Sequence, residues 1–275
     1  ASAGTSNFRA GVNAGNSIES GGNYNVLVGD EAGTALTTGD NNVALGYKAL
    51  FTEDTGNRSV AIGDFSLQNQ NNADSNYNTA VGYAAGAAVT TAVQNTLIGG
   101  LAGDAITTGN YNVGVGYTSL SANTTGVSNI AIGNFALSAN TTASNNTAVG
   151  QSALLANTTG AENTAVGALA GDALTVGANV VAVGYKALTS DTKGFGSVAI
   201  GNQALENQNF TSNTDTFNTA VGYFAGNDIT TGDRNTFVGG LAGDATDDGV
   251  GNTAVGYLAL SANCGNANVA VGIEC

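Results

Sequence analysis

The sequence predicts an all-β chain, folded as a parallel β-solenoid or β-roll of about 16 coils. First, a phrase of the form Asn-Thr/Val-x-Val/Ile-Gly recurs along the whole chain, usually every 17 residues. Second, each phrase holds a triplet rich in β-branched residues, such as Val60-Ala61-Ile62, which favours a strand. Third, the residues between these triplets are mostly Asn, Thr, Gly and Asp, which are typical of turns.

The glycine that closes each phrase, here called the register glycine, gives the period. Its spacing is 17 residues at every step from Gly82 to Gly201, and it varies from 16 to 21 elsewhere. Seventeen residues are too few for a strand, a helix and their connections, so we expect two short strands and two turns in each coil. The register glycines are Gly11, Gly29, Gly46, Gly63, Gly82, Gly99, Gly116, Gly133, Gly150, Gly167, Gly184, Gly201, Gly222, Gly239, Gly256 and Gly272.

Alternation assigns the faces of the first strand, because successive side chains of a strand point to opposite sides. Val60 and Ile62 share one face, and Ala61 lies on the other. The residue before each register glycine after Gly11 is Val, Ile or Leu. We therefore predict that the branched residues point inward, and that the small Ala61-type residues face a closely packed neighbour.

The segment after the register glycine predicts the rest of the core. Ala or Ser usually stands three residues after that glycine, and the next residue is Leu or Gly. Where it is Gly, an aliphatic residue follows three positions later; where it is Leu, that later residue is polar. Close packing requires such compensation of volume, so we predict that these positions line the interior. The pairs are Gly33–Leu36, Gly86–Val89, Gly103–Ile106, Gly171–Leu174 and Gly226–Ile229, and Leu120–Asn123, Leu137–Asn140, Leu154–Asn157, Leu188–Asp191 and Leu260–Asn263.

A longer period overlies the coils. Residues 29–50 match residues 167–188 at an offset of 138, and residues 78–82 match residues 218–222 at an offset of 140. We expect one repeat domain, 1–275, with an irregular segment 1–10, a first eight-coil block 11–149, and a second block 150–275 with a C-terminal cap. The start Ala1-Ser2-Ala3-Gly4 is typical of a mature end left by signal cleavage. Trimming of the sequence for expression explains this start equally well.

Composition excludes several classes of function. The 20 acidic and 6 basic residues give a net charge of −14, so we expect no nucleic-acid partner. Without histidine there is no Ser-His-Asp or Cys-His arrangement and no usual zinc site. Asp104, Asp172 and Asp244 recur at one coil position, but the calcium-binding nonapeptide is missing, so we expect them to solvate turns. We predict a non-enzymatic chain without cofactor, metal site or membrane insertion.

Two loops break the period at the same place in the two blocks, Gln68–Asn76 and Asn207–Thr216. Insertions in solenoids form surface loops, often on the binding face, although a bulge copied by duplication explains them too. The candidate contact residues are Gln68, Asn69, Gln70, Asn71, Asn207, Gln208, Asn209 and Phe210.

The two cysteines, Cys264 and Cys275, lie in the last coil and a half. An even number of cysteines in a secreted protein favours a disulfide. We expect Cys264 and Cys275 to pair with each other near the C-terminal end, or one of them to pair with another chain.

Two polar residue types recur at fixed coil positions. An Asn begins each first strand, and we expect its side chain to bond from coil to coil. Threonine pairs such as Thr90-Thr91 and Thr158-Thr159 form a second ladder. Regular threonines on a flat solenoid face are how several ice-binding proteins present themselves, so ice binding is the alternative function.

The phrases Ser59-Val60-Ala61-Ile62-Gly63 and Asn146-Thr147-Ala148-Val149-Gly150 resemble the head repeats of trimeric autotransporter adhesins. The longer phrase Asn-Thr-Ala-Val-Gly-Tyr-x-Ala resembles repeats of bacteriophage tail fibres and bacterial surface proteins. The adhesin resemblance implies a left-handed parallel β-roll with three chains per rod and small residues toward the shared axis.

We therefore predict a non-catalytic structural component of an extracellular fibre, secreted or on a cell or virion surface. It would act by self-association, as a homotrimer or an end-to-end homopolymer, because open coil edges favour the addition of further strands. Host or cell-surface glycans are the candidate external partners.

Overall fold

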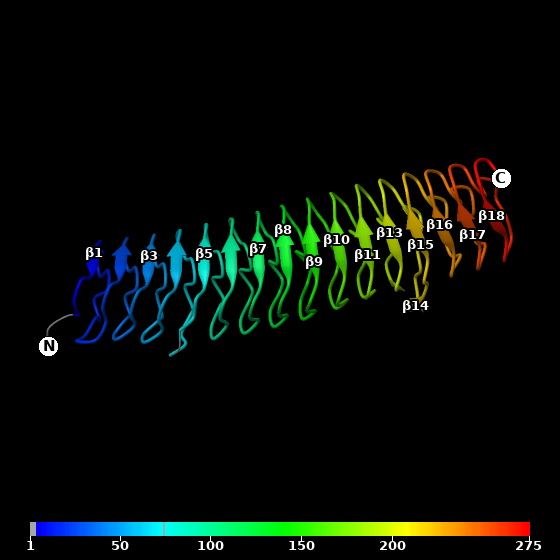
Figure 1. Cartoon of the computed structure of the whole chain (residues 1–275). Coiled ribbons are helices and arrows are strands. Elements are labelled where there is room, and N and C mark those ends of the chain that lie inside the picture. The colour runs from blue at the N-terminus through cyan, green and yellow to red at the C-terminus, as the bar shows by residue number, and fades with distance from the viewer. Residues whose placement is uncertain (1–3, 74) are drawn as a thin grey trace. The chain divides into compact units, whose positions relative to one another are not determined.

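The structure is a computed structural model that describes residues 4–73 and 75–275. Residues 1–3 of the expected cleavage end lie outside the described part of the chain. The chain divides into two compact units, Ala1–Phe135 and Ala136–Cys275. The elements of the described residues are all β-strands, joined by turns (Figure 1).

Each unit contributes eight strands to a parallel sheet, one strand per coil. In the first unit these are β1 (Phe8–Ala10), β2 (Val26–Val28), β3 (Val43–Leu45), β4 (Val60–Ile62), β5 (Thr79–Val81), β6 (Thr96–Ile98), β7 (Val113–Val115) and β8 (Ile130–Ile132). In the second unit they are β9 (Thr147–Val149), β10 (Thr164–Val166), β11 (Val181–Val183), β13 (Val198–Ile200), β15 (Thr219–Val221), β16 (Thr236–Val238), β17 (Thr253–Val255) and β18 (Val269–Val271). A separate parallel pair in the second unit joins β12 (Gly194–Phe195) to β14 (Thr214–Asp215).

The coils of each unit stack in register. Ala148 of β9 lies opposite Ala165 of β10, which in turn lies opposite Ala182 of β11. The same phase continues through each unit, so the 17-residue period places equivalent residues in columns. The predicted parallel β-solenoid is confirmed. The expected irregularity of residues 1–10 is wrong for Phe8–Ala10, which pair with β2.

The expected second strand in each coil is wrong. The segment after the register glycine consists of turns, because its second and fourth residues have left-handed backbones: φ is 53° at Lys48 and 52° at Leu50. A pleated strand requires negative φ at every residue. Left-handed residues at alternate positions therefore bend the chain back around the interior.

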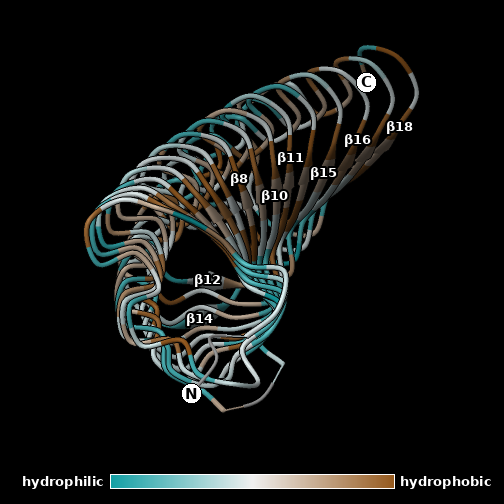
Figure 2. Cartoon of the chain, turned by 90° about the vertical axis from the view of Figure 1, so that its left-hand side faces the viewer, coloured by the Kyte–Doolittle hydropathy of each residue, from teal (hydrophilic) through white to brown (hydrophobic). Residues whose placement is uncertain are grey.

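The predicted orientation of the strand faces is also wrong. The middle residue of each strand, such as Ala44 or Ala61, is fully buried, whereas Val60 and Ile62 are half-buried and Leu45 is 44% exposed. The interior is narrow, and leucines from the opposite wall, such as Leu50 and Leu67, fill it. A branched residue in the middle of the strand would usually overfill the interior, so the branched side chains point outward. Figure 2 shows strands such as β10 and β11 side by side along one wall of the coils.

The predicted compensation of volume is confirmed. Leu36, Val89, Ile106, Leu174 and Ile229 are fully buried, as are Leu120, Leu137, Leu188, Asn123, Asn140, Asn157 and Asp191; Leu154 is 1% exposed. The pair in the last coil differs, because Leu260 is half-buried and Asn263 is exposed.

Where the middle residue of a strand is large, a small residue opposite it compensates for the volume. Phe237 fits inside because Gly243 lies opposite its ring. A Cβ on Gly243 would lie 2.6 Å from the Phe237 ring.

An asparagine precedes most strands of the sheet and joins neighbouring coils, as predicted. Asn163 illustrates the pattern: its side chain donates from Nδ2 to the Gly177 carbonyl at 2.8 Å, and its Oδ1 accepts from the Val180 amide at 3.0 Å. Most of these asparagines are buried, so they satisfy main-chain groups that water cannot reach.

The register glycine is required by a close approach of two coils. Gly150 has a φ of 136°, and a Cβ there would lie 2.5 Å from the Gly167 carbonyl oxygen. Any side chain would therefore force the coils apart and also strain the backbone.

Candidate functional site

The outward residues of the sheet strands form a surface that we call the strand face, defined in each unit as the first and third residues of every sheet strand. In the described strands from β2 to β17, leaving out the separate pair β12 and β14, these residues are Val, Ile, Leu and Thr, with no charged residue among them. Exposed members include Ile132 and Leu45 in the first unit and Val166, Ile200 and Val255 in the second. Exposed apolar side chains gathered on one uncharged face are typical of an interaction site.

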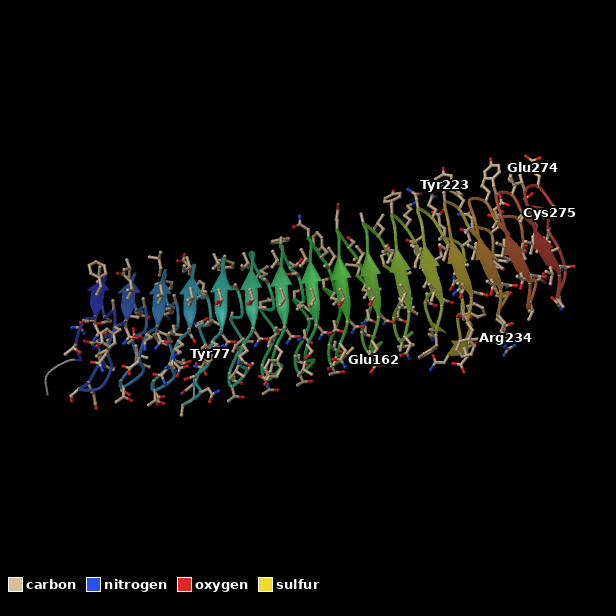
Figure 3. The ribbon with its side chains drawn as sticks, viewed as in Figure 1. Tyr77, Glu162, Tyr223, Arg234, Glu274 and Cys275 are labelled. Atoms are coloured by element: carbon tan, nitrogen blue, oxygen red, sulfur yellow. The ribbon has the colours of Figure 1, made fainter. Side chains whose placement is uncertain are left out.

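The turns at the two ends of the strands carry the polar and aromatic side chains. Tyr223 and Arg234 of the second unit point away from the ribbon at opposite ends of the strands (Figure 3). In the first unit the rings of Tyr47, Phe65 and Tyr83 pack edge to face, with centroid separations of 5.4 and 5.9 Å. Tyr47 and Tyr83 remain substantially exposed beside the strand face.

The two long loops are only in part the contact surfaces that the sequence predicts. Asn69, Asn71, Asn207 and Asn209 are exposed, and Gln68 is half-buried. Gln70, Gln208 and Phe210 are buried, so for these three residues the prediction of a contact role is wrong. Their side chains point inward because each loop must be anchored to the coil that it leaves.

A buried carboxylate anchors the loop of the first unit. Glu53 accepts hydrogen bonds from Gln70 Nε2 at 2.8 Å, Asn76 Nδ2 at 3.0 Å and the Gly56 amide at 2.8 Å. Burial raises the pKa of Glu53, and the hydrogen bonds from Gln70 and the main chain oppose that rise. Gln70 also donates to Ser59 Oγ at 2.8 Å, so one side chain connects three parts of the network.

The second unit repeats this arrangement 138 residues later. Asp191 accepts from Gln208 Nε2 at 2.6 Å and from the amides of Gly194 and Phe210 at 3.0 and 3.1 Å. Burial raises the pKa of Asp191 too. The sequence pairs already placed Asp191 in the core. The equivalent role of Glu53 was missed, although its offset from Asp191 would have revealed it.

A groove of about 780 Å³ lies beside the loop of the second unit. It is lined by Ser190, Asn207, Asn209, Asp228, Thr230, Ala245, Asp247 and Asn263. Asn207 and Asn209 belong to the predicted contact residues, whereas Asp228 and Asp247 are not among them. This groove is the candidate ligand site of the described chain.

The threonine ladder is engaged in hydrogen bonds between coils. Thr158 Oγ1 donates to the Thr175 carbonyl at 3.1 Å, and Thr175 Oγ1 donates to the Thr192 carbonyl at 2.9 Å. The equivalent hydroxyl of Thr90 donates to the Thr107 carbonyl in the first unit. The hydroxyl protons of the first threonines of the pairs therefore bond to the protein itself, whereas the second threonines, such as Thr91 and Thr159, are exposed.

The two cysteines are both free thiols in this structure. They line one pocket of about 550 Å³ together with Leu258, Leu260, Ser261, Ala262 and Glu274. Cys264 Sγ also lies 3.4 Å from Thr246 Oγ1. Their pairing, within the chain or between chains, stays a prediction.

Residues 4–73 and 75–275 contain no group of three or more Cys, Asp or Glu side chains arranged to hold a metal ion. Burial raises the pKa of Asp104, Asp172 and Asp244, which lie at one coil position. Within the same residues there is no helix with the length and apolar character needed to cross a membrane.

Comparison with known proteins gives no assignment. No protein-family model matches the chain, and no curated protein is significantly similar to it.

Proposed function

We propose that the chain is a non-catalytic structural component of an extracellular fibre that works by self-association. The observation that carries this proposal is the strand face. A protein with a net charge of −14 keeps a row of Val, Ile, Leu and Thr side chains free of charge along both units. Burial of such side chains against another copy removes apolar area from water at about 25 cal/mol per Å².

Self-association through the strand face also agrees with the hydrogen bonding of the coils. The strands already pair within their own sheet, so a partner would pack face to face on side chains rather than extend the ladder. A homotrimer, as the adhesin resemblance implies, is the assembly we favour. Its axis would be lined by the branched residues of the strand face and not by the small Ala61-type residues, which are buried inside each coil. End-to-end polymerisation would use the outermost coils instead, and the two modes respond differently to substitutions on the strand face.

The test measures the mass of the purified chain by light scattering, with electron microscopy of the same sample. We expect an oligomer for the wild type and a monomer for the double variant Leu45→Lys with Ile98→Lys, since lysines on the strand face cannot be buried without cost. The control, Thr91→Lys with Thr108→Lys, places the same charges on exposed turns. A monomeric wild type, or an oligomer that both variants retain, contradicts association through the strand face.

The first threonine of each pair gives the ice-binding alternative no support, because its hydroxyl proton bonds to a carbonyl of the neighbouring coil. The second threonine of each pair, such as Thr91 or Thr159, is exposed and is the surface that this alternative would use. A thermal-hysteresis assay on the purified chain tests it directly. We expect no hysteresis.

A further inference from the structure

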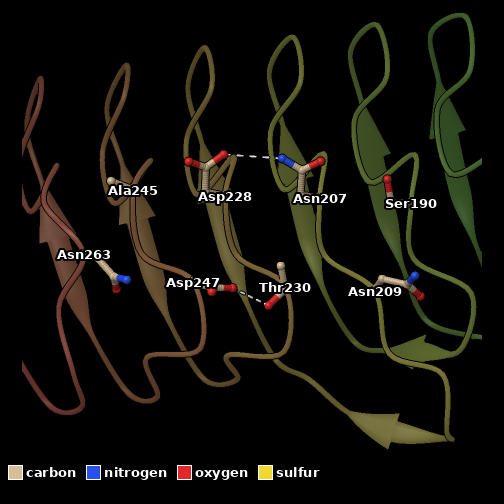
Figure 4. Close-up of a pocket in the computed structure, with 8 residues that line it drawn as sticks. All are labelled: Ser190, Asn207, Asn209, Asp228, Thr230, Ala245, Asp247 and Asn263. Carbon is tan, nitrogen blue, oxygen red and sulfur yellow. Dashed lines mark hydrogen bonds between the residues drawn. The ribbon is translucent and has the colours of Figure 1, made fainter.

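The groove of the second unit consists of two parallel rows of side chains. One row contains Ala245, Asp228, Asn207 and Ser190, and the other contains Asn263, Asp247, Thr230 and Asn209 (Figure 4). The residues come from five successive coils, so neighbours within a row are separated by about 4.8 Å, the ordinary distance between strands. This spacing resembles the length of one pyranose ring.

The main chain beneath the groove is held firmly in place. The amide of Asn209 donates to the Thr230 carbonyl at 2.9 Å, and the amide of Thr230 donates to the Asp247 carbonyl at 2.9 Å. The amide of Asp228 likewise bonds to the Asp244 carbonyl at 3.0 Å. Because these groups bond to neighbouring coils, a ligand would meet side chains on a preorganised backbone, which lowers the entropic cost of binding.

The lining is rich in hydrogen-bonding groups and carries negative charge. Asp228 accepts a long hydrogen bond from Asn207 Nδ2, at 3.4 Å, and Asp247 accepts one from Thr230 Oγ1. Neither Lys nor Arg is among the eight lining residues, and neither is an aromatic residue. Planar amides and carboxylates that face open space can pair with hydroxyl and ammonium groups.

The first block provides an internal comparison. At the coil positions of Asp228 and Asp247 it has Ala88 and Thr107, while Thr230 has its counterpart in Thr90. Coils of the same design therefore fold without the two carboxylates, so the fold of the coil does not require them.

We infer that the groove binds an amine-bearing saccharide, with Asp228 and Asp247 pairing with ammonium groups and Asn207 and Asn209 with hydroxyls. This inference rests on the proposed fibre function and names its external partner. The size of the groove and the row spacing fit a short, extended oligosaccharide. The two carboxylates favour a cationic sugar over an acidic one by charge complementarity.

The experiment titrates the full chain by calorimetry with three probes: a glucosamine hexamer, a galacturonic acid hexamer and spermine. We expect the glucosamine hexamer to bind, the galacturonic acid hexamer to show no binding, and spermine to bind at least tenfold more weakly because it lacks hydroxyls.

Variants assign the binding to the groove. Asp228→Ala with Asp247→Thr, which installs the residues of the first block, should weaken glucosamine hexamer binding at least tenfold. The control, Asp215→Ala with Asp248→Thr, removes the same charge from exposed positions outside the lining and should bind within twofold of the wild type. Ala245→Tyr fills the groove and keeps both carboxylates, and it should also abolish binding.

Absence of glucosamine hexamer binding overturns the inference. Equal losses in the two double variants, equal affinity for spermine, or full binding by Ala245→Tyr also overturn it. The proposed function fails separately, through the mass of the protein. A monomer that binds the hexamer contradicts the fibre and keeps the groove, while an oligomer that does not bind contradicts the groove alone.

Discussion

The loop Gln68–Asn76 of the first unit and the loop Asn207–Thr216 of the second share their buried side and differ on their exposed side. In both loops a glutamine, Gln70 or Gln208, joins a buried carboxylate to a serine and an asparagine of the solenoid wall. Outside, the coil that carries the second loop is two residues longer than its counterpart, and the second loop contributes β14, which pairs with β12. The groove with its two carboxylates lies beside this second loop.

The contrast between the buried and exposed sides of the two loops shows which residues of the repeat the fold constrains. A buried carboxylate must have its acceptors satisfied, so the duplicated network has kept its geometry. Exposed turn residues face water, which bonds to any polar group, so Ala88 and Asp228 are equally compatible with the coil. Differences between the two blocks at exposed positions therefore indicate function more readily than differences inside.

The largest expected effect is the loss of stability when either buried carboxylate, Asp191 or Glu53, is replaced. Asp191→Ala should lower the free energy of unfolding by about 4 kcal/mol, because it leaves several buried donors unpaired, including main-chain amides that cannot turn away. Glu53→Ala should cost about 2–3 kcal/mol, since two of its donors are side chains that can rotate toward other acceptors. Urea denaturation at neutral pH measures both. An equal or larger loss for Glu53→Ala contradicts this ranking.

Phe210 tests the part of the second loop that the first loop lacks. Its side chain is buried, so Phe210→Ala should cost about 2–3 kcal/mol through lost packing. Limited proteolysis should then cut the second loop before the first. Asn72→Ala, at a half-buried position of the first loop, serves as the comparison and should change stability less. Cleavage of the first loop at the same rate would show that Phe210 does not secure its loop.

Both loops should respond to pH in the same direction. Burial raises the pKa of Glu53 above its ordinary 4.5 and that of Asp191 above its ordinary 3.8. A raised pKa means that the folded state holds a proton at a pH where the unfolded state has released it. This contribution to the free energy of unfolding is therefore full below the ordinary values and is lost as pH rises through the raised ones.

We accordingly expect the urea midpoint to fall as the pH rises from about 4 to 7. Glu53→Gln together with Asp191→Asn should make this slope shallower, because neither replacement titrates. A midpoint that rises over the same range, or an unchanged slope in the double variant, contradicts the assignment.

The smallest expected effect on stability is that of the groove residues. Asp228→Ala with Asp247→Thr should change the free energy of unfolding by less than about 0.5 kcal/mol, as surface substitutions usually do. Thermal unfolding checks this, with Asp191→Ala as the destabilised reference. A large loss would assign the two carboxylates a structural role.

The sequence predicted which residues occupy equivalent positions in successive coils better than it predicted which of them point into the interior. The 17-residue period, the Asn ladder and the exchange of Leu and Gly all follow from residue type and spacing. Alternation divides a strand such as Val60-Ala61-Ile62 into two faces, but it does not state which face is interior. That depends on how far apart the walls lie, which leucines such as Leu67 determine from the opposite side.

Only some residues of the candidate groove could be predicted from the sequence, because the others come together only in the folded chain. The loops were visible as breaks in the period, so Asn207 and Asn209 could be proposed. Asp228 and Asp247 stand in coils of normal length, and they come together with the loop only when the coils stack. Gln208 and Phe210 belong to a loop whose composition is typical of a surface. They are buried nevertheless, because the Gln208 side chain and the Phe210 amide donate hydrogen bonds to the buried Asp191.

Because successive strands pair in the same register, the length of the protein can change by whole coils. If residues 151–167 were removed, Ala148 would come to lie opposite Ala182, two residues that already occupy equivalent places on either side of Ala165. Every column would continue unbroken, because each coil depends chiefly on its nearest neighbours. Recombination between such coils can therefore lengthen or shorten the protein in 17-residue increments without redesigning any surface, and the duplicated block is a visible trace of that process.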